Sequence, residues 1–316
     1  MEYTILVTAI GSFSAAEVIK SLRNMGCSSV YGCDIYPKEW HYISNQFCDV
    51  VKCPRVSDES AYIKFIQDLI TSKNINTIIP LTDIEVDFFN KNRPLFSDVS
   101  VTIGGEYFLS IARDKAKLDV FLKENDFPQI PTFLYEELTN KNFPVIAKPK
   151  NGRSSEGIIV VPTRQELSST TDFSNYIFQE YVIGDICTID IVRNDNTNEI
   201  TLIPRKELIR TKNGAGTTVE LFYDQKLIDL ATDISAKMKG HGAFNMEFIR
   251  TKEADFLIDV NPRFSAGIGF TGLMGYDIVK NTFTVFEGKP IEPVEAYSNM
   301  IAQKNMVEVI NKVISK

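Results

Sequence analysis

The chain has 316 residues, of which 44% are hydrophobic and 24% are charged, a balance that is typical of globular proteins and excludes a disordered one. The formal net charge of −7 argues against a general binder of nucleic acids or anionic membranes, so any phosphate site must be local. The first residues form no basic leader, and no apolar run reaches the roughly 20 residues of a membrane helix. We therefore expect a cytoplasmic protein of two or three lobes that binds neither nucleic acid nor membrane.

The cysteines are odd in number, and none of their spacings resembles C-x-x-C or a zinc-ligand set. Free cysteine commonly packs as a small hydrophobic side chain. We expect buried, reduced thiols at Cys27, Cys33, Cys48, Cys53 and Cys187.

Strand and helix patterns alternate over about the first hundred residues. Continuous apolar runs predict buried strands, an amphipathic segment that ends at Gly26 predicts a helix, and Ser57 or Asp58 can cap a second helix. The predicted strands are 3–9, 29–35, 75–81 and 99–104, and the predicted helices are 14–26 and one that runs to about Thr71. Such alternation is typical of a parallel sheet with helices on both faces, which is a Rossmann-like lobe.

The turn after the first strand, AIGSFSAAE at 9–17, invites comparison with a dinucleotide-binding loop in which Asp34 would bind the ribose. It has only Gly11 of the G-x-G-x-x-G pattern, so its backbone lacks the glycines that wrap a pyrophosphate. We interpret the turn as a plain connection and the first lobe as a scaffold.

The pattern changes after Gly105. RDKAKLDVFLKEN at 113–125 predicts a helix with Asp114 near its start, and Pro128 and Pro131 interrupt the chain beyond it. Strands in hairpin-like groups follow, with few helices until late in the chain. The predicted strands are 143–148, 157–161, 176–182, 186–194, 199–208, 242–250 and 254–260. This part is predicted to be an α+β unit built largely on antiparallel sheet.

The last predicted strand carries polar residues where a core strand would be apolar. Because side chains alternate across a strand, Asp259 and Asn261 are expected to share one face with Leu257. The other face then carries the apolar Phe256, Ile258 and Val260. A strand with one solvated face would account for an isolated D-x-N pattern. Other segments of the chain are therefore needed to decide between a solvated face and a binding site.

A turn centred near Glu253 joins this strand to 242–250 and brings Glu247 opposite Asp259, with side chains about 5 Å apart. Two opposed carboxylates repel unless a cation lies between them. Asn261 adds a third oxygen, and hard oxygen donors are the ligands that Mg²⁺ and Mn²⁺ prefer. We predict a metal site at Glu247, Asp259 and Asn261, completed by phosphate oxygens and water, with a solvated hairpin face as the alternative.

Two upstream segments suit a nucleotide. In VIAKPKNGRSSEGIIVV at 145–161, a strand delivers Lys148 to a Gly- and Ser-rich turn whose N–H groups can hold an anion, although a solvated hairpin loop would look similar. In YIFQEYVIGDICTID at 176–190, an extended link between Glu180 and Asp185 leaves backbone groups that an adenine edge can satisfy.

Five motifs follow one another in the chain: D-K at 114–115, V-x-A-K-P with a G-x-x-x-x-G turn, Q-E-Y-V-x-G-D, N-M-E-F and D-x-N-P-R. In this order they resemble the ATP-grasp family, in particular its branch with carbamoyl-phosphate-synthetase-like ATP-binding domains. The resemblance implies a Rossmann-like domain at 1–108 and a two-lobed ATP-grasp domain with antiparallel sheets at 109–316. The second domain would comprise a lid at about 127–181 and a C-terminal subdomain at about 182–316.

The resemblance also implies roles for single residues. Lys115 and Lys148 would contact the nucleotide phosphates under a lid at 151–157, which contains Ser154 and Ser155. Arg263 would steady the transferred phosphoryl group or the acyl phosphate. The metal ligands would again be Glu247, Asp259 and Asn261.

For the base and ribose, the family pattern implies that Glu180 receives the adenine amino group and that Tyr181 and Val182 offer backbone atoms to the ring. Asp185 would bind the ribose hydroxyl groups. The family more often has glutamate where this chain has Asp185 and Asp259, which are one methylene shorter.

The implied activity is that of an ATP- and Mg²⁺-dependent ligase, which activates a small carboxylate as an acyl phosphate and joins it to an amine. Activation of another acid, such as bicarbonate, is an alternative. A nucleotide-binding sensor or assembly subunit without turnover is another, because a fold does not dictate a function.

The substrates are less clear from the residues. The segment IPRKELIRTKNGAG at 203–216 carries Arg205 and Arg210, which would meet an acidic substrate together with Gly267, or would guard a solvated edge strand. Thr82 and Asp83 follow a predicted strand at the edge where parallel sheets bind ligands, although many loop residues there have no such role.

Overall fold

The computed structural model describes residues 3–152, 156–167, 172–305, 308 and 310. The first lobe contains the strands β1 (Thr4–Thr8), β2 (Ser29–Asp34), β3 (Asp49–Lys52), β4 (Thr77–Ile79) and β5 (Ser100–Val101), and the helices α1 (Ala15–Asn24), α2 (Tyr42–Phe47), α3 (Glu59–Lys73) and α4 (Asp83–Lys91). The strands form one parallel sheet in the order β3-β2-β1-β4-β5. The Rossmann-like parallel lobe is therefore confirmed.

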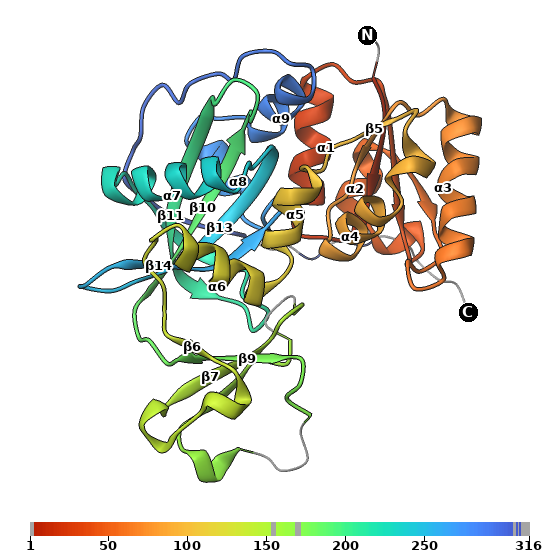
Figure 1. Cartoon of the computed structure of the whole chain (residues 1–316). Helices are drawn as coiled ribbons and strands as arrows, with labels where there is room; N and C mark the ends of the chain where they lie inside the picture. Colours follow the sequence, from red (N-terminus) through yellow and green to blue (C-terminus); the bar gives the residue numbers. More distant parts are fainter. Residues whose placement is uncertain (1–2, 153–155, 168–171, 306–307, 309, 311–316) are drawn as a thin grey trace.

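The middle strand β1 is buried on both faces. Leu6 packs with Ile78 of β4 in one core cluster, whereas Ile5 and Val7 pack in another with residues of α1. Both clusters continue into the second part of the chain. The first lobe is thus packed onto the large sheet described below, with α1 and α5 (Glu106–Ala112) between them (Figure 1).

The helix α6 (Lys115–Glu124) leads from the first lobe into the second part of the chain. Its N-cap is Asp114, whose carboxylate accepts hydrogen bonds from the N–H groups of Ala116 and Lys117 at 2.9 and 3.1 Å. A small antiparallel sheet follows, in the order β6-β9-β7-β8. Its strands are β6 (Thr132–Phe133), β7 (Val145–Pro149), β8 (Ile159–Val161) and β9 (Tyr176–Glu180), and they have a core of their own (Figure 1).

The third sheet is antiparallel and has the order β14-β13-β10-β11-β12-β15. Its strands are β10 (Asp185–Arg193), β11 (Ile200–Arg210), β12 (Gly216–Leu221), β13 (Gly242–Arg250), β14 (Asp255–Asn261) and β15 (Met300–Gln303). The accompanying helices are α7 (Gln225–Lys237), α8 (Ile268–Leu273) and α9 (Ile278–Phe286). Single 3₁₀ turns occupy Lys38–Trp40, Arg93–Phe96, Tyr135–Glu137, Asn140–Asn142 and Arg164–Glu166.

The position of β11 differs from one of the two expectations. Because β12 and β15 extend the sheet beyond it, β11 lies in the interior and is not a solvated edge strand. The small strand β3 and the helix α2 were also not predicted, since both are short and mix polar with apolar residues.

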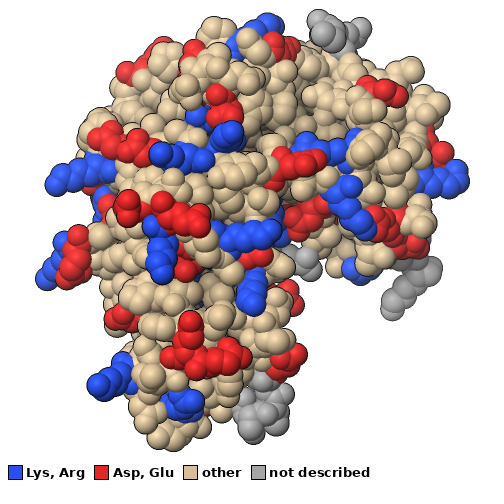
Figure 2. Space-filling view, viewed as in Figure 1, with Lys and Arg blue, Asp and Glu red and all other residues tan. Residues whose placement is uncertain are grey.

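Surface and core agree with the composition. All five cysteines are free and buried, as predicted. Acidic and basic side chains are interspersed over the face shown in Figure 2. Among the described residues, no helix has the length and apolar character needed to cross a membrane.

Candidate active site

A cavity of about 780 Å³ lies where the three sheets meet. Loops that follow β1 and β4 line it from the first lobe, β7 and the link after β9 from the small sheet, and β10, β11, β13 and β14 from the large sheet. Its volume falls in the range of small-molecule sites. Its charged lining includes Lys115, Lys148, Glu180, Arg210, Glu247 and Asp259.

Glu247 of β13 pairs directly with Asp259 of β14, as the predicted turn required. A β-bulge follows, because Phe248 pairs with Leu257 and leaves Ile258 unpaired. The bulge reverses the alternation of side chains, so Leu257 joins Val260 in the same core cluster. Leu257 therefore does not share a face with Asp259, and Ile258 lines the cavity instead, which corrects the predicted faces.

Each of the two opposed carboxylates has a cationic partner. Lys115 Nζ lies 2.8 Å from Asp259 Oδ1, and Arg210 Nη2 lies 2.8 Å from Glu247 Oε2. Burial raises the pKa of Glu247, and the nearby charge of Asp259 adds to this, while Arg210 opposes it. These two ion pairs place two positive and two negative charges together at one wall of the cavity.

The donor set at this wall fits a hard divalent cation. Glu247 and Asp259 contribute carboxylate oxygens, and Asn261 lies on the same wall with its Nδ2 turned to Asn245 Oδ1 at 3.1 Å. The amide oxygen of Asn261 is thereby left on the other side, toward Arg263 Nη2 at 3.3 Å. The described residues contain no group of three or more His, Cys, Asp or Glu side chains that could hold a metal, so any ion here needs ligands from phosphate or water as well.

Lys148, the penultimate residue of β7, has an unusual environment for a lysine. It is 5% exposed, and its Nζ donates to Gln179 Oε1 at 2.7 Å. Gln179 is held in turn by Thr132, so a neutral amide fixes the ammonium group. Burial lowers the pKa of Lys148 to about 8, with a further contribution from Lys115, against the attraction of Asp259 and Glu247.

The link after β9 lines the cavity as expected. Glu180, Tyr181 and Val182 all lie on its wall. The N–H of Tyr181 already donates to the carbonyl of Pro144 at 3.1 Å, so Tyr181 can offer a ring only its carbonyl group. Gly152 and Glu156 line the cavity from the lid turn, while Ser154 and Ser155 lie outside the described residues.

Asp185 is not brought to the cavity. Its carboxylate lies 2.7 Å from Lys206 Nζ, and its side chain is 54% exposed. Alternation along β10 places Asp185 with the core residue Cys187, whereas Ile186 and Thr188 line the cavity. The structure therefore gives no support to the predicted ribose contact of Asp185.

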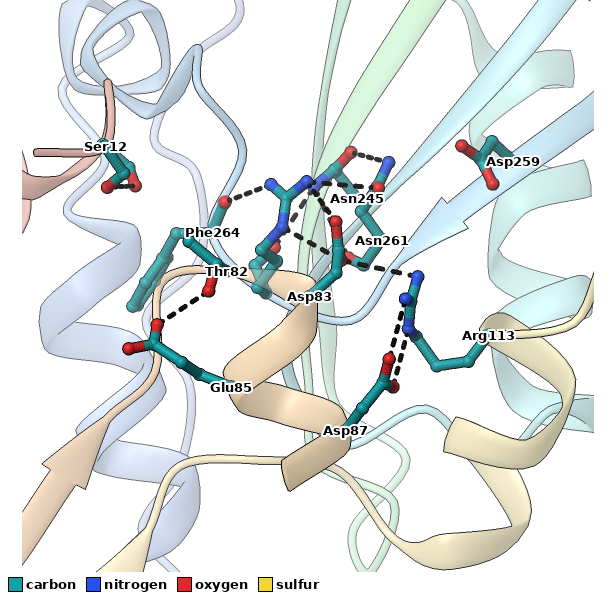
Figure 3. A network of polar contacts seen from close by, with 12 residues as sticks. Ser12, Thr82, Asp83, Glu85, Asp87, Arg113, Asn245, Asp259, Asn261 and Phe264 are labelled. Carbon is teal, nitrogen blue, oxygen red and sulfur yellow. Dashed lines mark hydrogen bonds and ion pairs between the residues drawn. The ribbon is translucent and has the colours of Figure 1, made fainter. Parts of the chain in front are cut away.

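Arg263 is held by a residue of the first lobe that the motifs did not reveal. Its Nε and Nη2 donate to the two carboxylate oxygens of Asp83 at 3.1 and 2.9 Å. Figure 3 shows Asp83 at the start of α4, with Arg113 on its other side. In the sequence, Asp83 stands out only as a residue that follows a strand at the ligand-binding edge.

Arg205 is buried in the wall of the cavity. It is 3% exposed and donates to Asp190 at 2.6 Å and to Glu207 at 3.1 Å. A Cβ on Gly267 would lie 2.6 Å from its guanidinium group, so that position requires glycine for packing. Arg205 and Arg210 both line the cavity, but two carboxylates occupy Arg205 and only one pairs with Arg210, which leaves Arg210 as the better candidate of the two for an acidic substrate.

Comparison with known proteins identifies the domain that contains most of this cavity. A model of the ATP-grasp domain matches residues 112–267, the range that contains all five motifs. Residues 112–267 of the chain therefore form an ATP-grasp domain.

Three solved structures share the fold. A biotin carboxylase–β,γ-ATP complex from Campylobacter jejuni has a TM-score of 0.77 at 16% identity, with 94% of this chain and 74% of that chain covered. The biotin carboxylase domain of the Hydrogenobacter thermophilus 2-oxoglutarate carboxylase, with MgADP and bicarbonate, has a TM-score of 0.73 at 16% identity, with 92% and 71% covered. An L-amino acid ligase from Bacillus licheniformis has a TM-score of 0.70 at 13% identity, with 89% and 73% covered. At these identities the likeness concerns the fold.

Proposed function

We propose that the protein is an ATP- and magnesium-dependent ligase that activates a carboxylate as an acyl phosphate and joins it to an amine. The observation that carries the proposal is the meeting of Lys115, Lys148 and Arg263 with Glu247 and Asp259 around one cavity of an ATP-grasp domain. Cations that face phosphates and carboxylates that face a metal are the groups that phosphoryl transfer requires.

The reaction proceeds in two transfers. The bond between the terminal phosphorus and the bridging oxygen of ATP breaks, and a carboxylate oxygen of the substrate forms a new bond to that phosphorus. The amine nitrogen then attacks the acyl carbon, phosphate leaves with the former carboxylate oxygen, and the nitrogen loses a proton. ADP, phosphate and the amide are the products, and no side chain becomes covalently attached.

The residues of the chain have distinct tasks in this scheme. Lys148 and Lys115 would bind nucleotide phosphates, and Glu180, Tyr181 and Val182 would line the adenine. Arg210 would bind the carboxylate once Glu247 turns from it, and Arg263 would face the transferred group. Glu247, Asp259 and Asn261 would hold Mg²⁺, which neutralises phosphate charge when bound. The bound nucleotides and magnesium named for the two carboxylase structures support this kind of cofactor.

Bicarbonate is the second candidate acid. The Hydrogenobacter thermophilus structure holds a bicarbonate anion, and its fold covers 92% of this chain. The two candidates differ in the acid that stimulates phosphate release from ATP, so one screen with bicarbonate beside amino acids and small carboxylates separates them.

We predict that hydroxylamine captures the activated acid. With ATP, Mg²⁺ and the acid found in the screen, but without an amine, hydroxylamine should yield a hydroxamate, because it is a small nucleophile that attacks an acyl phosphate. Mass spectrometry should find one hydroxamate for each ADP. An acid that stimulates ADP formation and gives a stable phosphorylated hydroxyl compound would show a kinase instead, and ATP binding without any turnover would show a sensor.

We also predict that ADP affinity falls as the pH rises through about 8. The ammonium form of Lys148 binds phosphate, and burial lowers its pKa to about 8 in the free protein. Phosphate favours the charged form, so binding above this pH must take up a proton, and affinity should fall by up to about tenfold per pH unit. Calorimetry at pH values from about 6.5 to 9.5 measures both the ADP affinity and the proton uptake on binding.

Lys148→Met is the control for this titration, because it keeps the side-chain volume and cannot ionise. Its ADP affinity should be weak and independent of pH over the same range. Parallel curves for the wild type and Lys148→Met would assign the pH dependence to another group.

A further inference from the structure

We propose that Asp83 is a positioning residue for Arg263, through which the first lobe takes part in phosphoryl transfer. The inference rests on the proposed function. It also changes the interpretation of the first lobe as a scaffold, because Asp83 lies outside the 112–267 range that matches the ATP-grasp model.

Asp83 and Arg263 form a bidentate pair. Both oxygens of Asp83 accept from Arg263, at 3.1 and 2.9 Å, and the carboxylate is 4% exposed. Arg263 Nη1 also donates to the carbonyl of Phe264 at 3.1 Å. Two parallel bonds to one carboxylate set the plane of a guanidinium group, and the third bond prevents it from pivoting. Arg263 therefore presents one fixed edge to the cavity that it lines.

Asp83 is itself held in place. It is the first residue of α4, where the helix dipole favours a negative charge. Arg113 Nη1 lies 3.6 Å from its Oδ1, and Arg113 is fixed by two bonds to Asp87 at 2.9 and 3.0 Å, one helical turn further (Figure 3). Burial alone would raise the pKa of Asp83, but the two guanidinium groups outweigh it and the pKa is lowered. The carboxylate is thus charged at neutral pH.

Without the charge of Asp83, Arg263 would have other carboxylates within the same cavity. Asp259 and Glu247 lie on the same cavity wall as Arg263, and each already has a cationic partner. An Arg263 released from Asp83 would compete for these carboxylates, which the metal requires. Asp83 therefore both orients Arg263 and keeps it away from the carboxylates of Asp259 and Glu247.

The test compares isosteric variants of two aspartates on α4. Asp83→Asn removes the charge that holds Arg263, and Asp87→Asn is the matched control, since Asp87 contacts Arg113 and not Arg263. The readout is solvent exchange of the Arg263 Nε–H, observed by ¹⁵N NMR of the full-length protein and assigned by its loss in Arg263→Lys. Asp83→Asn should accelerate this exchange by at least about tenfold, while Asp87→Asn should change it less than about twofold.

A kinetic arm links the pair to the reaction. With the acid found in the screen, Asp83→Asn should lower kcat by about 30-fold and change the affinity for Mg·ATP by less than about threefold. Asp83→Glu keeps the charge on a longer side chain and should fall between Asp83→Asn and the wild type in both measurements. It also decides the question if Asp83→Asn does not fold.

The outcomes separate the two proposals. Unchanged Arg263 exchange in Asp83→Asn, equal acceleration in Asp87→Asn, or wild-type values throughout for Asp83→Glu would each overturn the role of Asp83. If no acid stimulates turnover, the ligase proposal fails, and the NMR arm still decides whether Asp83 positions Arg263.

Discussion

Replacement of Asp259 by alanine should lower the turnover of the ligase reaction by about a thousandfold, while the protein stays folded. Asp259 lies opposite Glu247 on the cavity wall, and in the proposed site its removal takes a ligand from the ion that phosphoryl transfer requires. ATP affinity without metal should fall little, because the lysines remain. The measurement is phosphate release in the presence of the acid, with Mg²⁺ varied over a wide range.

The control for this variant is Asp255→Asn, on the same strand but outside the cavity. Asp255 bonds Arg250 at 2.7 and 3.1 Å, so its replacement disturbs the hairpin to a similar degree without touching the site. Asp259 also pairs with Lys115, and the Mg²⁺ titration separates the two roles. An unchanged Mg²⁺ requirement in Asp259→Ala, or more than about a tenth of wild-type turnover, would show that Asp259 is not a metal ligand.

The pairing of Glu247 with Asp259 could be predicted because a hairpin register follows from the position of its turn. The bulge at Ile258 could not. Phe256, Leu257 and Ile258 are all apolar, so hydrophobicity does not reveal which of them faces the core. Only the packing of Leu257 together with Val260 makes the extra residue visible.

Two other predictions depend on tertiary packing that local patterns do not reveal. Asp185 fits its motif, but whether an exposed residue at a strand end faces the cavity or solvent depends on what covers each face of β10. The basic segment around Arg205 suggested an edge strand because β12 and β15 have weak sequence patterns of their own. These two strands extend the sheet beyond β11.

The contact between Asp83 and Arg263 lies beyond local patterns altogether. The two residues are 180 positions apart and meet only because shared core clusters pack the first lobe onto the large sheet. The motifs named the arginine and not its partner, since the motif describes what faces the ligand and the partner belongs to another lobe.

Replacement of Arg263 by lysine should lower the rate of hydroxamate formation by about a hundredfold and change ATP affinity by less than about threefold. Lysine keeps the charge but cannot make the two parallel bonds to Asp83, so the group that we propose faces the developing charge loses its fixed orientation. An interaction made mainly in the transition state lowers the rate and leaves the binding of the ground state nearly unchanged.

Arg250→Lys is a matched control, because Arg250 forms an equally bidentate pair with Asp255 at the far end of the same hairpin, outside the cavity. It should form hydroxamate at close to the wild-type rate, whereas Arg263→Lys should not. If both variants lose activity equally, the loss reflects a weakened hairpin. If Arg263→Lys retains the wild-type rate, a positive charge alone is sufficient at this position, and the orientation that Asp83 imposes has no part in the reaction.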